Sequence, residues 1–208
     1  MSNKEKLSQD LAEIRSMMER STKVHSLSGW VGILLGTYAL AGYFIAKFYL
    51  KFHPVALYEE HKDSDLHFSN SVQIAVLGLL IIGVAILSTL YFSHRKAYKK
   101  NEKFWTPSAK RLIFNLSVPM IAGGILILIF LNQGLTGLLA PTSLLFYGLA
   151  LINAAHFTYS ELRILGFCQV FLGLAGYYFV PHAMEFWATG FGVFHITYGI
   201  YMHNKYEK

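Results

Sequence analysis

The stretch LIFNLSVPMIAGGILILIFLNQGLTGLLAPTSLLFYGLALINAAHFTYS, residues 112–160, contains no Asp, Glu, Lys or Arg. It is too long for one membrane crossing, because about 20 residues of α-helix span the hydrocarbon core of a bilayer. Near its middle stand residues that are typical of a turn: Asn132, Gln133, Gly134, Gly137 and Pro141. The stretch therefore predicts two membrane-spanning helices, over 112–131 and 138–157.

Apolar runs of similar length flank this stretch on both sides. They cover residues 27–46, 72–92, 162–180 and 183–202. Each run is continuously apolar and does not alternate with period two, which favours helices over a β-barrel. The sequence therefore predicts an all-α polytopic membrane protein, with six transmembrane helices between residues 26 and 208.

Residues 1–25 are charged and carry a different pattern. Leu7, Leu11, Ile14 and Met18 recur at spacings of four, three and four residues, which places them on one face of a helix. We expect an amphipathic N-terminal helix that lies on the cytoplasmic headgroups. The alternative is a helix that pairs with a partner or with itself.

The distribution of basic residues predicts the orientation of the chain. With the N-terminus inside, the inner segments hold 15 of the 18 Lys and Arg residues, and the outer side keeps Lys47, Lys51 and Lys62. We therefore expect a multi-pass protein of the plasma (inner) membrane with both termini in the cytoplasm. The net charge of +6 mostly reflects this bias. Because the basic residues are divided among loops that face anionic lipid, we expect membrane lipids and no nucleic acid as partners.

Glycine spacing indicates an internal repeat. Gly29 and Gly36 in the first span are separated as Gly166 and Gly173 are in the fifth, with six residues between each pair. In the second span Gly83 stands eleven residues before His94, and in the sixth Gly192 stands eleven before His203. These matches predict three helical hairpins that each go out and come back, with glycines where helix backbones approach closely.

Three such hairpins, each with a proline near the outer turn (Pro54, Pro141, Pro181), resemble the HdeD-type acid-resistance membrane proteins. The stretch 166–199 matches best. The middle hairpin departs from the pattern, because Gly123 and Gly124 are adjacent, and the long first outer loop departs as well. The resemblance implies a stress-linked, six-helix protein of a bacterial inner membrane, and it implies no catalytic residues.

Polar side chains inside predicted spans are costly in lipid and are therefore candidates for function. The candidate ligand-binding residues lie mostly in the cytoplasmic half: Asn115, Asn153, His156, Gln169 and His195. They predict a polar pocket open to the inside, with hydrogen bonding or proton transfer at a histidine. The alternative is that they bond between helices and only fix the packing.

The outer loop 51–70 carries His53, His61 and His67 among carboxylates. Imidazole and carboxylate groups bind divalent metals, but this spacing matches no established ligand motif, so we predict no metal site. A solvated connector is one interpretation of the loop. The other is an acid sensor, because histidines gain charge between pH 7 and 5.

No signature of an enzyme appears in the chain. It has no Gly-x-Ser-x-Gly motif and no phosphate-binding loop, and Cys168 is its single cysteine, so no disulfide within the chain is possible. We therefore predict a protein without catalytic residues, metal or cofactor. The leading hypothesis is a stress-linked protein that binds a lipid, a small apolar ligand or a partner protein between its hairpins. The alternative is a small transporter or channel that forms its path as a homo-oligomer.

Overall fold

The computed structural model describes residues 29–52, 64–99 and 105–207, with side chains from residue 72 onward in the second of these ranges. Helices make up the regular structure of the described residues, which contain no strand. The N-terminal helix predicted over 1–25 lies outside the described residues, as do His53, His61 and the side chain of His67. The all-α prediction is confirmed for the described part of the chain.

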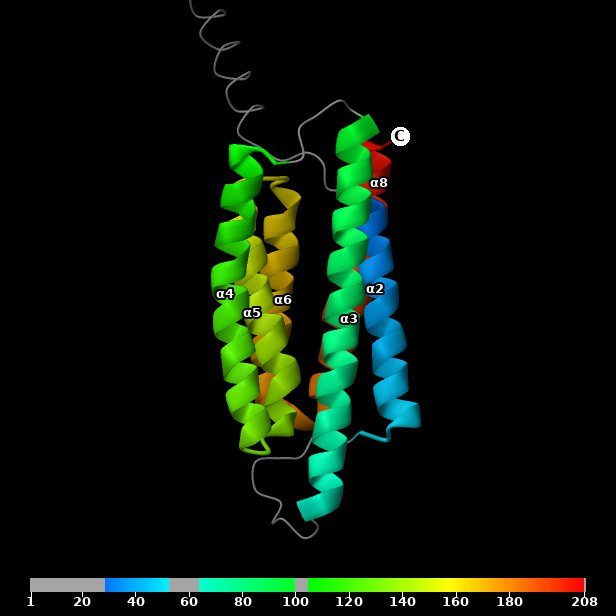
Figure 1. Ribbon diagram of the computed structural model, residues 1–208, viewed down its shortest axis with the longest axis vertical. Helices are drawn as coiled ribbons and strands as arrows, with labels where there is room; N and C mark the ends of the chain where they lie inside the picture. Colours follow the sequence, from blue (N-terminus) through cyan, green and yellow to red (C-terminus); the bar gives the residue numbers. More distant parts are fainter. Residues whose placement is uncertain (1–28, 53–63, 100–104, 208) are drawn as a thin grey trace, which may run out of the picture.

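The long helices run up and down in alternation, so that their connections gather at the two ends of the bundle (Figure 1). The first four are α2 (Gly29–Phe44), α3 (Ser64–Lys99), α4 (Pro107–Asn132) and α5 (Leu139–Ala154). They are followed by α6 (Glu161–Tyr178), α7 (Ala183–Trp187) and α8 (His195–Tyr206). Wider π-helical turns follow α2 over Ile45–Tyr49 and join α7 to α8 over Ala188–Phe194.

Local sequence explains where α4 begins and ends. The Thr106 hydroxyl accepts a hydrogen bond from the backbone N–H of Ala109 at 3.1 Å, and Pro107 stands at the first helical position, where no N–H is needed. After α4 the chain turns at Gly134, whose φ of 72° is readily adopted by glycine. The turn predicted near the middle of 112–160 is therefore present, and α4 runs unbroken through Pro119.

Among the described residues, four segments are long and apolar enough to cross a membrane. They are Gly29–Tyr49, Val72–Lys99, Pro107–Asn132 and Thr136–Ala154. The last hairpin does not meet the same criterion, because polar residues lower its mean hydropathy: Glu161, Arg163 and Gln169 in α6, and Glu185 and His195 in the return run. A membrane protein is thus indicated by composition, and crossing by all six predicted spans stays a prediction.

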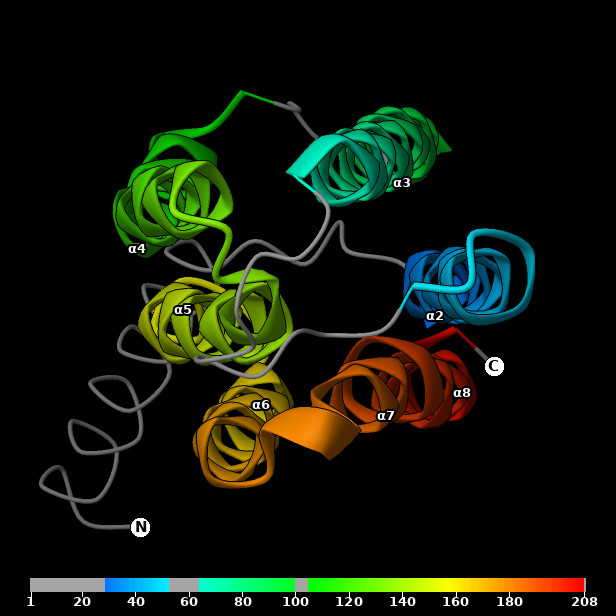
Figure 2. The ribbon, with the colours of Figure 1, turned by 90° about the horizontal axis from the view of Figure 1, so that it is seen from below.

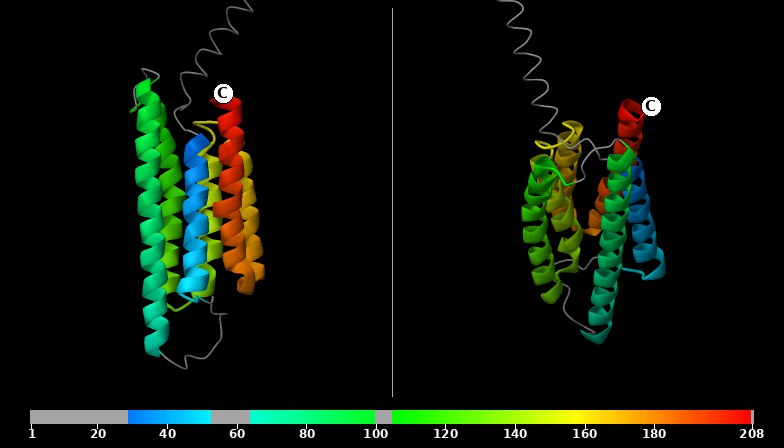
Figure 3. Two further views of the ribbon diagram at one scale, coloured as in Figure 1. Left: turned by 90° about the vertical axis from the view of Figure 1, so that its right-hand side faces the viewer. Right: turned by 45° about the horizontal axis from the view of Figure 1, so that its top comes forward.

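Seen from one end, the helices form an arc whose two end members are α3 and α4 (Figures 2 and 3). From α3 the arc passes through α2, α8 with α7, α6 and α5 to α4. The contact between α5 and α6 is the largest and contains the apolar core, formed by Leu151, Ala154, Ala155, Leu162 and Leu165. Within the described residues, α3 packs mainly on α2, and α4 packs mainly on α5.

Glycines allow two close helix contacts of the arc. Gly29 and Gly36 of α2 lie against the backbone of α8, and Gly166 and Gly173 of α6 lie against the backbone of α5. A side chain at any of these positions would meet backbone atoms of the neighbouring helix. The repeated glycine pairs read in the sequence therefore mark contacts between different hairpins.

Candidate functional site

A buried polar cluster joins the second hairpin to the third. Gln169 of α6 is fully buried, and His195 at the start of α8 is 3 % exposed. Both side chains reach the backbone carbonyl of Gly190, with Gln169 Nε2 at 2.8 Å and His195 Nδ1 at 3.0 Å. The Tyr147 hydroxyl of α5 lies 2.9 Å from His195 Nε2. Helices of two hairpins thus share one set of hydrogen bonds.

The π-helical turn Ala188–Phe194 makes this arrangement possible. Such turns are rare in helices and are frequent at functional sites. Gly190 has no side chain, and a Cβ there would collide with Gln169 Oε1 and Leu144. The absent side chain therefore lets the amide and the imidazole approach the helix backbone.

The hydrogen bonds define the tautomer of His195. The Gly190 carbonyl only accepts, so Nδ1 carries the proton and donates it to that oxygen. Nε2 is then an acceptor, and the Tyr147 hydroxyl donates to it. Both side chains donate to the Gly190 oxygen, and the 3.4 Å approach of Gln169 Nε2 to His195 Nδ1 brings two donors together without a bond. Neutral His195 satisfies this geometry.

One polar atom of the cluster is unpartnered. Gln169 Oε1 is buried and accepts no hydrogen bond in the structure. A buried acceptor without a donor costs about 1–3 kcal/mol. Gln169 Oε1 is therefore the unsatisfied acceptor of the cluster.

The structure brings two of the five predicted binding residues together, Gln169 and His195. Asn153 and His156 are exposed at the end of α5 and in the turn after it. Asn115 donates to the Arg111 carbonyl, one turn earlier in its own helix, at 2.8 Å. The described geometry of Gln169 and His195 resembles packing between helices more than an open pocket.

At the end of the bundle that holds the C-terminus, Glu207 joins three helices. Its Oε1 accepts from the backbone N–H of Gly29 at 3.1 Å and from Lys96 Nζ at 2.8 Å. Its Oε2 lies 2.8 Å from His203 Nδ1. The Glu207 and Lys96 side chains are each 14 % exposed, so this contact is shielded from solvent. The carboxylate also lies at the N-terminus of α2, where the helix dipole favours a negative charge.

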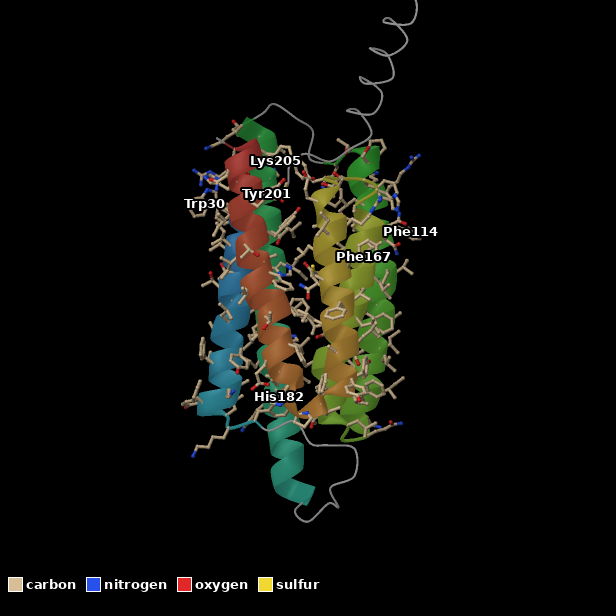
Figure 4. All side chains as sticks on the ribbon, turned by 180° about the vertical axis from the view of Figure 1, so that it is seen from behind. Trp30, Phe114, Phe167, His182, Tyr201 and Lys205 are labelled. Carbon is tan, nitrogen blue, oxygen red and sulfur yellow. The ribbon has the colours of Figure 1, made fainter. Side chains whose placement is uncertain are left out.

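A second carboxylate, Glu161, fastens the start of α6 to the same end. Lys205 Nζ and the Tyr206 hydroxyl both donate to Glu161 Oε1. Partial burial raises the pKa of Glu161, but hydrogen bonds from Lys205, its own backbone N–H and Tyr206 outweigh this effect and hold the pKa at about 2. Figure 4 shows Lys205 and Tyr201 at this end, with His182 near the opposite one.

The opposite end has an ion pair between the first and third hairpins. Lys47 Nζ donates to Glu185 Oε1 and to the Tyr43 hydroxyl, both at 2.8 Å. Both charged side chains are more than 40 % exposed, so the pair contributes little to stability if water surrounds it. It nevertheless places the ends of α2 and α7 side by side.

Sequence reasoning missed Tyr147 and Glu207. Tyr147 was not among the predicted binding residues, and nothing in its own helix shows that its hydroxyl meets His195. Glu207 stands 178 residues from Gly29 in the chain. Only the pairing of α2 with α8 brings these two residues together.

Two further observations bear on the chemistry of the chain. Among the described side chains, those of residues 29–52, 72–99 and 105–207, no three His, Cys, Asp or Glu groups gather as a metal site would require. No protein-family model, curated protein or solved structure matches the chain. The HdeD-type resemblance therefore depends on the glycine and proline pattern alone.

Proposed function

We propose that the chain is a non-enzymatic integral membrane protein, built from three out-and-back hairpins that cross the plasma (inner) membrane six times. The four long apolar segments support this proposal. The charge distribution supports it as well, because Arg95, Lys96, Arg163 and Lys205 lie at the end that holds the C-terminus, whereas Lys47 lies at the other end. By the positive-inside rule, the C-terminal end is cytoplasmic.

Cysteine labelling tests the orientation. In a Cys168→Ala background, single cysteines are placed at Ser64 and Ser108, at opposite ends of the bundle, and intact cells are treated with a membrane-impermeant reagent. We expect Ser64→Cys to react and Ser108→Cys to react only after the cells are opened. The reverse pattern would overturn the orientation, and reaction of both in intact cells would overturn the number of spans.

The protein's proposed activity is to bind a lipid, a small apolar ligand or a partner protein along the uncovered faces of α3 and α4. One observation carries this proposal. In the apolar 18-residue stretch of α3, 0 % of the residues are buried within the chain, and in that of α4, 6 % are buried. In the corresponding stretch of Thr136–Ala154, which contains α5, 56 % are buried. The two end helices of the arc thus lack the second neighbour that α2 and α5 have.

Photo-crosslinking distinguishes binding from ordinary contact with bulk lipid. A photoreactive amino acid replaces Leu128 on α4, and a matched control replaces Phe171 on α6; both positions are exposed. We expect position 128 to capture a defined molecule or chain, identified by mass spectrometry, and position 171 to capture lipids in proportion to the membrane composition. Capture of the same bulk lipids at both positions would refute the binding function.

The HdeD-type resemblance adds a physiological proposal, a role under acid stress. Deletion of the protein should lower survival at low external pH, and expression of the intact chain should restore it. Equal survival with and without the protein would remove the stress link and would leave the binding proposal in place.

A second candidate function is transport through an oligomer, and the polar cluster favours it. Gln169, His195 and Tyr147 place hydrogen-bonding groups within the proposed membrane region, and Gln169 Oε1 lacks a donor. If the cluster lies on a path for protons or small polar solutes, His195→Ala should reduce flux into proteoliposomes at an unchanged amount of inserted protein. Unchanged flux, or no flux in the wild type, would refute transport.

A further inference from the structure

The contact between α2 and α8 has a defined construction. A methyl group added at Gly36 of α2 would lie 2.6 Å from the Gly192 carbonyl oxygen and from Ile196 Cγ1, and 3.0 Å from the Ile196 backbone nitrogen. The glycine of the outgoing helix therefore packs against a glycine of the return helix and against the isoleucine one turn later. The two helices belong to the first and third hairpins.

The contact between α6 and α5 repeats this construction. A methyl group at Gly166 of α6 would lie 2.8 Å from the Gly148 carbonyl oxygen and from Ile152 Cγ1, and 3.0 Å from the Ile152 backbone nitrogen. The same three partner atoms recur, in the same order and within 0.2 Å, for the third and second hairpins. One type of helix contact is thus used twice in the chain.

The three return helices share a common register, which locates the corresponding position on α3. Each return helix has one glycine at the same place in the repeat. The residue two positions before that glycine contacts the outgoing helix of the same hairpin. These contacts are Ile81 with Gly42, Phe146 with Gly123, and Gly190 with Gln169. The repeat glycines are accordingly Gly148 of α5, Gly192 in the return run of the third hairpin, and Gly83 of α3.

This third position is vacant. A Cβ on Gly83 would meet no atom within 4 Å, and Leu87, one turn later, is 69 % exposed. Two residues separate Gly83 from Ile81, which is about 200° around an α-helix. Because Ile81 faces α2, Gly83 faces away from the main neighbour of α3, toward the outside of the bundle.

The matching surface lies on α4. Ser117 and Gly124 have six residues between them, as Gly29 and Gly36 do in α2. Gly123 is occupied by Phe146 of α5, whereas a Cβ on Gly124 would meet nothing within 4 Å. The adjacent glycines thus have separate roles, and the second of them completes the small-residue pair of an outgoing helix.

We propose that these two vacant surfaces are the halves of an interface between copies of the chain, with α4 of a second copy packing on the Gly83–Leu87 face of α3. The proposal rests on the proposed function, since it names a second copy as the partner protein. Two copies with the same orientation in a membrane bring α3 and α4 together antiparallel, as α8 meets α2 and α5 meets α6 within one chain. The second copy therefore supplies the third contact of a type that the chain already uses twice.

Isoleucine substitutions at glycines test the interface, because a branched side chain prevents close approach of the backbones. We expect Gly83→Ile and Gly124→Ile to weaken self-association in lipid bilayers at least 10-fold, measured by counting subunits by single-molecule photobleaching. Gly78→Ile is the matched control, since Gly78 is an equally open glycine of α3 and lies about 140° away around the helix. A wild type that stays monomeric, or equal association of all three variants, would overturn the proposal.

Disulfide formation identifies the partner. In the Cys168→Ala background, chains with Gly83→Cys are mixed with chains with Gly124→Cys, and we expect a link between copies under mild oxidation. A chain that carries both cysteines and forms only an internal link would show that its own α4 closes on α3, and would overturn the proposal. Correct labelling of Ser64→Cys and Ser108→Cys with a monomeric wild type would overturn the self-association alone, whereas wrong labelling would overturn the membrane topology.

Discussion

The glycine contacts predict that two similar substitutions, Gly36→Ala and Gly78→Ala, change the free energy of unfolding in opposite directions. In Gly36→Ala the new methyl group would lie 2.6 Å from the Gly192 oxygen, about 0.8 Å closer than an ordinary C···O contact of roughly 3.4 Å. The oxygen belongs to the backbone and cannot rotate away, so α2 and α8 must separate. A gap of about 0.5–1 Å removes a quarter to a half of the dispersion energy of the atoms concerned. Overpacking of this kind costs about 1–3 kcal/mol in the free energy of unfolding.

Gly78→Ala is the comparison, because a methyl group at Gly78 meets nothing within 4 Å. Alanine is more favourable than glycine within a helix by about 0.8–1 kcal/mol, so this variant should be more stable than the wild type. Gly36 also lies within a helix, so both alanines gain this propensity, and the two variants should differ by the overpacking cost of about 1–3 kcal/mol.

Reversible unfolding in mixed detergent and dodecyl sulfate micelles, followed by circular dichroism, measures this difference. Gly166→Ala should resemble Gly36→Ala, because the same three atoms lie at nearly the same distances. If Gly36→Ala proves as stable as Gly78→Ala, α2 and α8 do not approach each other as described, and the repeat of the contact is refuted.

Three further outcomes are expected. Tyr147→Phe removes the hydroxyl that donates to His195 and should cost about 1 kcal/mol of unfolding free energy, whereas Tyr178→Phe, at an exposed position, should cost little. The pKa of Glu161 is about 2 in the folded chain and 4.5 without its partners, so its contribution to the free energy of unfolding is complete above pH 4.5 and is lost as the pH falls through about 2. Glu161→Gln should therefore remove this part of the acid dependence when the free energy of unfolding is measured against pH. Glu207→Ala should increase hydrogen exchange at the start of α2 and the end of α3, measured by mass spectrometry, while Glu185→Ala, at the opposite end, should leave exchange there unchanged.

The sequence predicted the helical class and the main turns well, because continuous apolar runs and turn residues act locally. The helix that ends at Asn132, the turn at Gly134 and the break around Pro181 all follow from neighbouring residues. The glycine pairs also pointed to close helix contacts. The helices that these glycines contact could not be predicted, because apolar helices carry no pattern that specifies which neighbour each one packs against.

The candidate site was predicted in part for the same reason. Gln169 and His195 were recognisable as polar residues that are costly to place in lipid. Their shared contact with the Gly190 carbonyl depends on a π-helical turn, which no spacing in the sequence predicts. Asn153 was placed with them by its depth along the chain. Depth does not determine the direction in which a side chain points, and Asn153 is exposed on its helix.

The pairing of α2 with α8 has a consequence for biosynthesis. In the proposed topology the first hairpin enters the membrane early, yet α8, which covers Gly29 and Gly36, is translated after α2 to α6, and Glu207 follows α8. During translation the glycine face of α2 therefore stays exposed to lipid or to a chaperone until α8 has been made. A chain that ends before Glu207 would lose the contacts of this residue with α2 and α3 but would keep the described helices from α2 to α8. In the proposed topology such a chain would still insert, and its defect would lie in the assembly of α8 with α2 and α3.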